Sequence, residues 1–264
     1  MMRLLISGCC IISLLISSCS NKSAEADKII PEQEKHLREL IAQYPDSLLL
    51  KENLVQYFRE NGNYGEAITT TTNFLKKDSL NDRLLDIKAT LHFENGDTIN
   101  AIKAFEKAIE INPQPEYIIA LGSLYAQTKN PLALALADAL LQAPKANAQK
   151  QALFIKGLYY SYTGDKIKAL SFFDDCLTID YRDILAYREK AICLYDLNRY
   201  GEALDFLRKA VAVQNTFDEG YYWMGRCYEK LNKRKEAIDS YQFALQIDPD
   251  YLEAKDALGR MGIK

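Results

Sequence analysis

The segment from Glu94 to Pro113, ENGDTINAIKAFEKAIEINP, carries two apolar stripes at helical spacing. Alanines stand at positions 101, 104 and 108, and the bulky residues Ile102, Phe105 and Ile109 run beside them. Apolar residues that recur every three or four positions predict an amphipathic helix. The thin alanine stripe indicates that a second helix approaches so closely that only a methyl group fits between them.

The same pattern returns along most of the chain at an interval of 34 residues. The interval is marked by six alanines: Ala67, Ala101, Ala135, Ala169, Ala203 and Ala237. Five residues before each alanine stands a turn former: Gly62, Gly96, Asn130, Gly164, Asn198 or Asn232. The residue four positions after each alanine is mostly large and apolar, and the residue twelve before it is mostly small. A fixed period of this length predicts stacked structural repeats.

The pattern resembles the tetratricopeptide repeat, a helix–turn–helix unit, in its period, its small positions, its turn and its closing prolines, Pro113 and Pro249. The resemblance implies an all-α fold, a right-handed α-solenoid of helix pairs with capping helices. Helix pairs stack in this way because one pair cannot bury its apolar stripes alone. It places an N-terminal capping helix in 31–47, a C-terminal capping helix in 252–264, and six repeats in register over 48–251: 48–81, 82–115, 116–149, 150–183, 184–217 and 218–251.

Two units depart from the common pattern. In the third unit, the motif LGxxY at residues 121–125 runs one residue early, which predicts a local shift in helix packing and a bend in the superhelix. In the first unit, Lys51 and Val55 replace the usual aromatic and small residues.

The first nineteen residues, MMRLLISGCCIISLLISSC, have the features of an export signal. The apolar run from Leu4 to Ile16 is too short for a membrane-spanning helix and suits the core of a secretory signal. The last four residues, Ile-Ser-Ser-Cys, resemble the bacterial lipoprotein box. That resemblance implies a signal peptide over 1–18, palmitate or a similar lipid on Cys19, and a polar tether over 19–30. An ordinary cleaved signal with incidental cysteines is the alternative.

The residue after Cys19 bears on location. It is Ser20, whereas an aspartate there would resemble an inner-membrane retention signal. Two or more acyl chains anchor a protein durably where one is marginal. We therefore expect a lipid anchor in the outer membrane of a bacterial envelope, with the folded domain facing the periplasm.

Three cysteines lie in the repeats, and the periplasm is oxidising. Cys193 and Cys227 occupy equivalent positions in adjacent first helices. Packed helix axes are about 8–10 Å apart, which is too far for a disulfide. Cys176 falls where other units have a buried alanine. We expect all three to be small core residues, and His92 to be a partly buried core histidine.

Charge and motifs exclude several function classes. The net charge of −3 offers no basic surface for nucleic acid, and the two histidines, His36 and His92, are too few and too distant for a common zinc or acid–base site. The chain has no phosphate loop, nucleophile elbow or metal-ligand spacing. Asp174 and Asp175 are adjacent on a helix and point in different directions. We expect no enzymatic activity, no cofactor, no metal and no nucleic-acid partner.

In tetratricopeptide repeat proteins, the first helices of successive pairs line a concave groove where ligands commonly bind. Carried onto this sequence, the groove positions are Glu52, Gln56 and Arg59; Arg83, Asp86 and Phe93; Tyr117, Ala120 and Leu124; Phe154, Leu158 and Ser161; Arg188, Ile192 and Tyr195; Tyr222, Arg226 and Glu229. This predicts a charged groove near the N-terminus and an aromatic one with two arginines towards the C-terminus. The lysine–asparagine clamp of the chaperone-tail-binding subgroup is absent.

The partner-binding residues predicted on this basis are Phe154, Leu158, Arg188, Ile192, Tyr195, Tyr222 and Arg226. Arginine offers a bidentate fork to a carboxylate. The resulting hypothesis is a lipid-tethered, non-enzymatic adaptor or scaffold that holds another envelope protein, or a peptide segment of one.

Three alternatives stay open for this groove. The two arginines could pair with neighbours such as Asp196 or Glu229, and the aromatic residues could serve only to pack the helices. The tyrosine-rich surface of the C-terminal repeats could instead bind a solute or glycan. The whole chain could be a purely structural spacer.

Overall fold

The computed structural model describes residues 30–142 and 146–263, and within these ranges every regular element is an α-helix. The helices are α1 (Glu32–Gln43), α2 (Leu48–Glu60), α3 (Tyr64–Lys77), α4 (Asp82–Glu94), α5 (Thr98–Ile111), α6 (Pro115–Gln127), α7 (Leu132–Leu141), α8 (Ala146–Thr163), α9 (Lys166–Ile179), α10 (Ile184–Asp196), α11 (Tyr200–Val213), α12 (Asp218–Lys230), α13 (Arg234–Ile247) and α14 (Leu252–Arg260). Successive helices pack as pairs and the pairs stack in a row, which confirms the predicted all-α solenoid.

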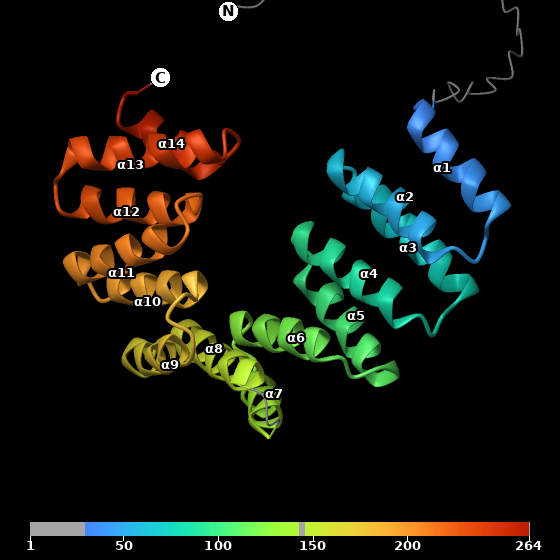
Figure 1. Cartoon of the computed structure of the whole chain (residues 1–264), viewed down its shortest axis with the longest axis horizontal. Coiled ribbons are helices and arrows are strands. Elements are labelled where there is room, and N and C mark those ends of the chain that lie inside the picture. Colours follow the sequence, from blue (N-terminus) through green and yellow to red (C-terminus); the bar gives the residue numbers. More distant parts are fainter. Residues whose placement is uncertain (1–29, 143–145, 264) are drawn as a thin grey trace, which may run out of the picture.

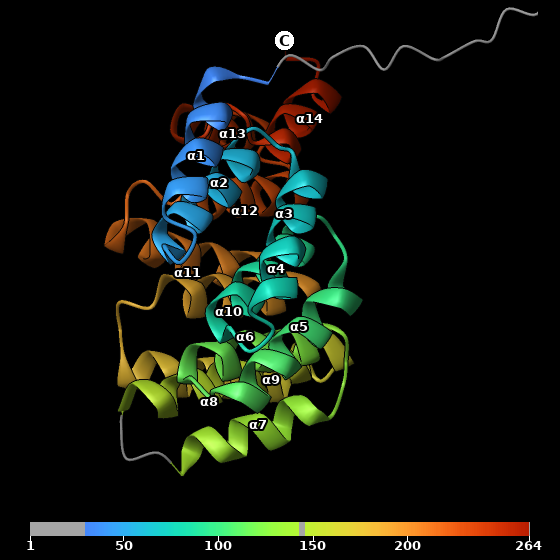
Figure 2. The ribbon, with the colours of Figure 1, turned by 90° about the vertical axis from the view of Figure 1, so that its right-hand side faces the viewer.

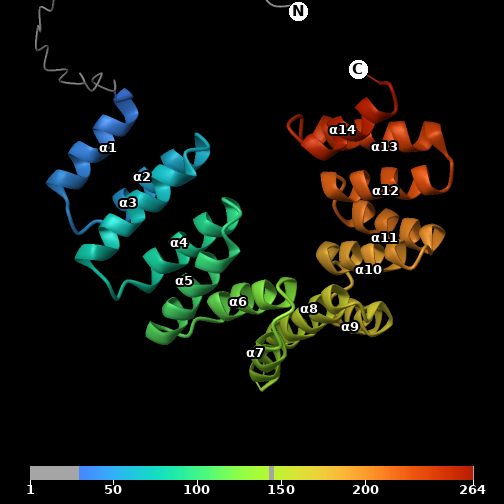
Figure 3. The ribbon, with the colours of Figure 1, turned by 180° about the vertical axis from the view of Figure 1, so that it is seen from behind.

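The row of pairs forms two arms (Figure 1). Helices α1 to α6 make one arm and α8 to α14 the other, and the arms meet where α6 packs against α8. The same division is visible from behind (Figure 3), and the side view places α7 at the end opposite α1 and α14 (Figure 2).

The first helix of each pair faces the inside of this bent row. Along the bend, α6 contacts α8, α8 contacts α10, and α10 contacts α12. In Figure 1, α4, α8 and α10 lie nearer the space between the arms than their partners α5, α9 and α11. The helices that carry the predicted groove positions therefore lie on the inner side of the solenoid.

The small positions of the repeat are points of closest helix approach, as predicted. Ala67, Ala101, Ala169, Ala203 and Ala237 are completely buried. Two further small positions receive an aromatic ring from the second helix of the pair. A Cβ atom added at Gly157 would lie 2.6 Å from Cε1 of Phe173, and one at Gly225 would lie 2.5 Å from Cε1 of Tyr241. The thin stripes exist because rings and backbones occupy the remaining space.

The third unit breaks the alanine register. Ala135 is exposed, while Ala133 and Ala137 are buried, so the expectation for Ala135 is wrong. Helix α7 is nearly all Ala and Leu, so both faces are apolar enough to pack and the pattern does not fix which one turns inward. The turn ahead of it is also displaced, because the left-handed backbone conformation falls on Lys129 (φ 59°) rather than on Asn130.

The one-residue shift predicted for the first helix of this unit is present. Gly122 of α6 is buried, and a Cβ there would lie 2.7 Å from Cδ1 of Ile155 in α8. Its close neighbour is thus the next unit rather than its own partner helix. Helix α8 begins at Ala146, four residues before the unit boundary predicted at 150, and the two arms diverge at this point (Figure 1).

The two ends of the solenoid are covered differently. Helix α1 buries no side chain completely, and its Leu37 and Ile41 pack half-buried against the cluster around Leu54 and Phe58. Helix α14 buries Ala254, Ala257 and Leu258.

Cys176, Cys193 and Cys227 are free thiols in the core, as predicted. Burial raises the pKa of Cys176 and of Cys227 to about 12. The imidazole of His92 is partly buried, and its Nδ1 lies 3.2 Å from Oδ2 of Asp97. Burial lowers the pKa of His92, which keeps this core histidine neutral at pH 7.

The predicted signal peptide (1–18), Cys19 and the tether as far as residue 29 lie outside the described residues. Among the helices of the described part of the chain, none combines the length and apolar character that crossing a membrane requires.

Candidate functional site

A cleft opens on the inner side of the C-terminal arm, where the first helices α8, α10 and α12 meet. Its volume is about 570 Å³. It is lined by Lys129, Ser161, Tyr162, Gly164, Lys166, Arg188, Glu189, Ile192, Asp196, Glu219 and Trp223. Of the residues predicted to bind a partner, Arg188 and Ile192 line this cleft, and Tyr195, Tyr222 and Arg226 contact its lining residue Trp223.

Arg188 is held between two carboxylates. Its Nε and Nη2 donate to Oε1 of Glu189 at 3.0 and 2.8 Å, and its Nη1 pairs with Glu219 of the next unit. The alternative that this arginine pairs with neighbours is therefore correct, although the partners differ from the Asp196 and Glu229 considered from the sequence. Burial raises the pKa of the Glu189 carboxyl, against the attraction of Arg188. Arg188 has little free charge to offer a partner.

Arg226 has aromatic neighbours instead. Its guanidinium carbon lies 4.9 Å from the ring centre of Trp223, 5.0 Å from that of Tyr195 and 6.0 Å from that of Tyr222. Its Nη2 donates to the hydroxyl of Tyr195 at 3.3 Å. Within residues 30–142 and 146–263 no carboxylate pairs with it. Burial acts to lower the pKa of Arg226, but the adjacent tyrosines Tyr195 and Tyr222 raise it above its ordinary value.

The aromatic residues around Arg226 also pack the helices. Tyr195 and Trp223 meet edge to face with ring centres 5.5 Å apart, and Trp223 and Tyr222 do so at 5.9 Å. Tyr222 further contacts Tyr241 of α13 and Tyr251 at the start of α14. These rings hold the arginine in one place while remaining partly exposed. The packing role considered from the sequence is therefore present, and the partner-binding role of these aromatic residues stays a prediction.

The remaining predicted residues are unequal in exposure. Leu158 is only 5% exposed and belongs to the core. Phe154 is half-buried against Phe173, with ring centres 5.7 Å apart. Ile192 lines the cleft. Trp223 also lines the cleft, although it is not among the predicted partner-binding residues and lies directly after the groove position Tyr222.

The inner side of the N-terminal arm has its own cleft of about 360 Å³, between α2 and α4. Its arginines are all paired. Arg83 donates to Glu52 and to Asp86 at 2.9 Å each, and Nε of Arg59 donates to Glu94 at 2.7 Å. The predicted charged groove is present, and its charged side chains pair with one another. In the described ranges, no three histidine, cysteine or acidic side chains are grouped so as to hold a metal ion.

Comparison with protein families identifies the repeat. Residues 83–115, 150–183 and 219–251 match models described as tetratricopeptide repeat. The chain therefore contains tetratricopeptide repeats. Among curated proteins it is similar to stress-induced-phosphoprotein 1 of Caenorhabditis elegans, 24% identical over 158 residues, which are 60% of this chain and 47% of that protein. The chain spans less than half the length of this and other curated relatives that it matches.

Solved structures share the architecture. A tetratricopeptide repeat protein from Parabacteroides merdae superposes with a TM-score of 0.71 at 20% identity, over 86% of this chain and 90% of that one. PilW, described as a type IV pilus biogenesis factor, superposes with a TM-score of 0.59 at 18% identity, over 79% of this chain and 97% of that one. At these identities the likeness establishes the fold alone.

Proposed function

We propose that this chain is a non-enzymatic scaffold that holds an acidic peptide segment of another envelope protein on the inner face of its C-terminal arm. The observation that carries the proposal is Arg226, a guanidinium kept in place by three aromatic rings and without a carboxylate partner in the described part of the chain. A cation that is positioned in advance loses little freedom when it binds, which favours affinity.

The neighbouring side chains indicate what the segment would contain. Tyr195, Tyr222 and Trp223 supply apolar ring surface around the guanidinium, and the cleft beside them contains Ile192 and Tyr162. A carboxylate next to an apolar side chain would satisfy both features. Arg188 would contribute mainly by keeping the wall of the cleft rigid, because Glu189 and Glu219 already neutralise it.

The test is site-specific photocrosslinking in cells. Tyr162, which lines the cleft and is 43% exposed, is replaced by the photoreactive residue p-benzoylphenylalanine; Phe93, on the N-terminal arm and 44% exposed, gives the matched control. We expect one or two specific proteins to be captured from position 162, few from position 93, and the capture to fall at least tenfold with Arg226→Glu. Capture that persists in the Arg226→Glu variant would contradict the proposal.

The membrane anchor is a separate part of the proposal. We infer from the lipoprotein-box resemblance that Cys19 carries the lipid and that the scaffold is held at the outer membrane, facing the periplasm. Growth with a labelled fatty acid should label the natural chain but not a Cys19→Ala variant. Equal labelling of both would exclude Cys19, and labelling of neither would favour an ordinary cleaved signal.

A glycan-binding function receives less support from the geometry. The rings of Tyr195, Tyr222 and Trp223 meet one another edge to face, and their faces are turned towards Arg226. They therefore do not form the flat platform on which a sugar ring would stack. A thermal shift with oligosaccharides and no captured protein would reverse this preference.

A further inference from the structure

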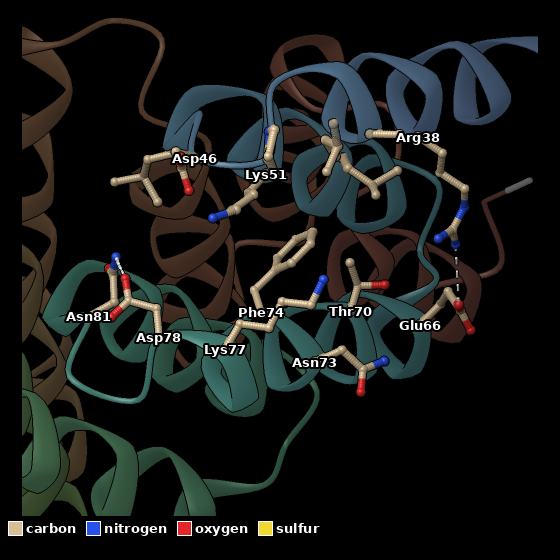
Figure 4. Close-up of a pocket in the computed structure, with 15 residues that line it drawn as sticks. Arg38, Asp46, Lys51, Glu66, Thr70, Asn73, Phe74, Lys77, Asp78 and Asn81 are labelled. Atoms are coloured by element: carbon tan, nitrogen blue, oxygen red, sulfur yellow. Dashed lines mark hydrogen bonds and ion pairs between the residues drawn. The ribbon is translucent and has the colours of Figure 1, made fainter.

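A third cleft, of about 820 Å³, lies between α1, α2 and α3, at the N-terminal end of the solenoid (Figure 4). It is separate from the inner cleft of the N-terminal arm, because α2 turns different residues to each. Lys51 faces the cleft beside α1 and α3, while Glu52 and Gln56 line the inner cleft between α2 and α4. Nothing in the proposed function uses this third cleft.

Two lysines give it a chemistry that the other repeats lack. Lys51 stands where later units have Leu85, Ile119, Leu153, Tyr187 and Tyr221. Lys77 stands where the second, fourth, fifth and sixth units have Ile111, Ile179, Val213 and Ile247, and the third has Lys145. Only the first unit places a cation at both positions. Lys51 is half-buried and Lys77 is exposed. A lysine at the half-buried position 51 lowers stability unless it serves another purpose.

Both ammonium groups are free to bind an anion. In the described part of the chain neither Lys51 nor Lys77 has an ion-pair partner. Nζ of Lys51 lies 5.9 Å from the ring centre of Phe74. In Figure 4, Lys51 reaches from α2 towards α3, and Lys77 lies on the opposite wall near Phe74.

The third cation of the cleft is already engaged. Nε of Arg38 donates to Glu34 at 2.9 Å, and its Nη2 lies 3.8 Å from Oε1 of Glu66. One carboxylate of the rim, Asp78, accepts a hydrogen bond from Asn81 at 2.8 Å. The positive charge that remains available to a ligand is therefore that of the two lysines.

The rest of the lining narrows the class of ligand. Ile41, Leu54 and Phe74 supply apolar surface, and the amides of Asn73 and Asn81 supply donors and acceptors. A lipid chain would need walls without this polarity. A phosphate dianion would be repelled by the nearby carboxylates, three of which line the cleft: Asp46, Glu66 and Asp78. A peptide matches all of these features, because it combines amide groups, an apolar side chain and a single carboxylate.

We infer that the cleft between α1 and α3 is a second peptide-binding site, which receives a segment with one carboxylate next to an apolar residue. The carboxylate lies between Lys51 and Lys77, and the apolar side chain lies on Phe74. Helix α1 buries no side chain completely, so it is able to adjust to such a segment without disrupting the core. Together with the site at Arg226 on the other arm, the chain then holds two peptide segments at once and bridges the proteins to which they belong.

The test uses an array of short peptides with both ends blocked, in which one glutamate is flanked in turn by every residue type. A second array carries glutamine in place of the glutamate. We expect the full chain to bind glutamate spots with an aromatic or large aliphatic neighbour. Lys51→Glu with Lys77→Glu should lower that binding at least tenfold, which corresponds to about 1.4 kcal/mol.

Two variants control for charge and for location. Lys103→Glu reverses an exposed lysine on α5, outside the cleft, and should leave binding unchanged. Arg226→Glu should remove any spots that the inner face binds but not those that depend on Lys51 and Lys77. Failure of this proposal therefore differs from failure of the proposed function.

A third variant guards against simple loss of folding. Lys51→Leu with Lys77→Ile restores the residues of the second unit, Leu85 and Ile111, and should raise the melting temperature while abolishing the preference for glutamate over glutamine. Equal binding to the two arrays by the natural chain, or a glutamate preference that survives this variant, would overturn the proposal. So would a failure of the natural chain to bind any glutamate spot.

Discussion

The inner faces of the two arms differ in one arginine. In the N-terminal arm, Arg59 and Arg83 are neutralised by Glu94, Glu52 and Asp86, and the arginines stay largely exposed. In the C-terminal arm, Arg226 is surrounded by aromatic rings and has no carboxylate partner in the described part of the chain. An arginine on the inner face can therefore be part of a closed ion pair or remain an open cation, and the residues beside it decide which.

The depth of the ion pairs separates the arms as well. The side chain of Arg188 is 22% exposed and that of Glu189 is 11% exposed, against 54% for Arg83 and 27% for Glu52. A shallow pair contributes little to stability because water screens it, whereas breaking a buried pair leaves a charge without a partner. Ion pairs of similar geometry on one solenoid should therefore differ greatly in the stability that is lost when one partner is removed.

The largest effect follows from that difference. Glu189→Ala should lower the free energy of unfolding by about 3 kcal/mol, because Arg188 stays buried with only the more exposed Glu219 to compensate it. Glu52→Ala, which removes a partner of Arg83, should cost about 0–1 kcal/mol. Urea unfolding of the two variants measures both values. Equal losses would mean that burial does not distinguish the arms.

The next effect compares the third unit with the fifth. Ala203→Leu should lower the free energy of unfolding by about 1–3 kcal/mol, since the residue is completely buried between helices. Ala135→Leu, at the corresponding position of α7, should change it by less than about 0.5 kcal/mol, since Ala135 is exposed. Thermal or urea unfolding provides the measurement, and a large loss for Ala135→Leu would contradict the register found in α7.

A smaller effect is expected when a lysine at position 226 keeps the positive charge but lacks the planar guanidinium. Arg226→Lys should weaken partner capture about fivefold, since lysine lacks the planar fork that packs between the rings and grips a carboxylate. Arg59→Lys, on the arm with closed pairs, should leave capture unchanged. Quantitative crosslinking from position 162 reports both, and full activity of Arg226→Lys would mean that only the charge matters.

The smallest effect is the absence of a reaction. All three core thiols lie in the C-terminal arm, and burial raises the pKa of Cys176 and Cys227 to about 12, so the reactive thiolate is scarce at pH 8. A thiol reagent should leave Cys176, Cys193 and Cys227 unmodified in the native protein and react with them as urea opens this arm. Rapid labelling of these three thiols without denaturant would show that the C-terminal arm opens on its own.

Much of the fold could be predicted because each packing contact recurs in several repeats. Ala67, Ala101 and Ala203 share one environment, so a single pattern describes them all. The prediction for the third unit failed because the sequence of α7 does not show which face of the helix is buried. Ala133, Ala135 and Ala137 are equally apolar. Register there is set by α6 and α8, which sequence spacing does not describe.

The groove was predictable in position but not in availability. The groove positions carried over from the tetratricopeptide repeat put Arg188 and Arg226 on first helices, which lie on the inner side. Which of them has a free charge depends on the side chains that reach them from neighbouring helices. Glu189 and Glu219 turn towards Arg188, while Trp223 and Tyr195 turn towards Arg226, and such rotamer choices are not encoded in spacing.

The displaced turn at Lys129 is followed by one at Gly164 that is back in step with Gly62 and Gly96. The irregularity is thus confined to the bend between the arms, and the helix pairs before and after it keep the same 34-residue spacing. Whole helix pairs could be gained or lost in either arm during evolution without any change in that bend. The distance between the two tips would then change in discrete increments, so descendants of this chain could span partners of different size with one unchanged joint.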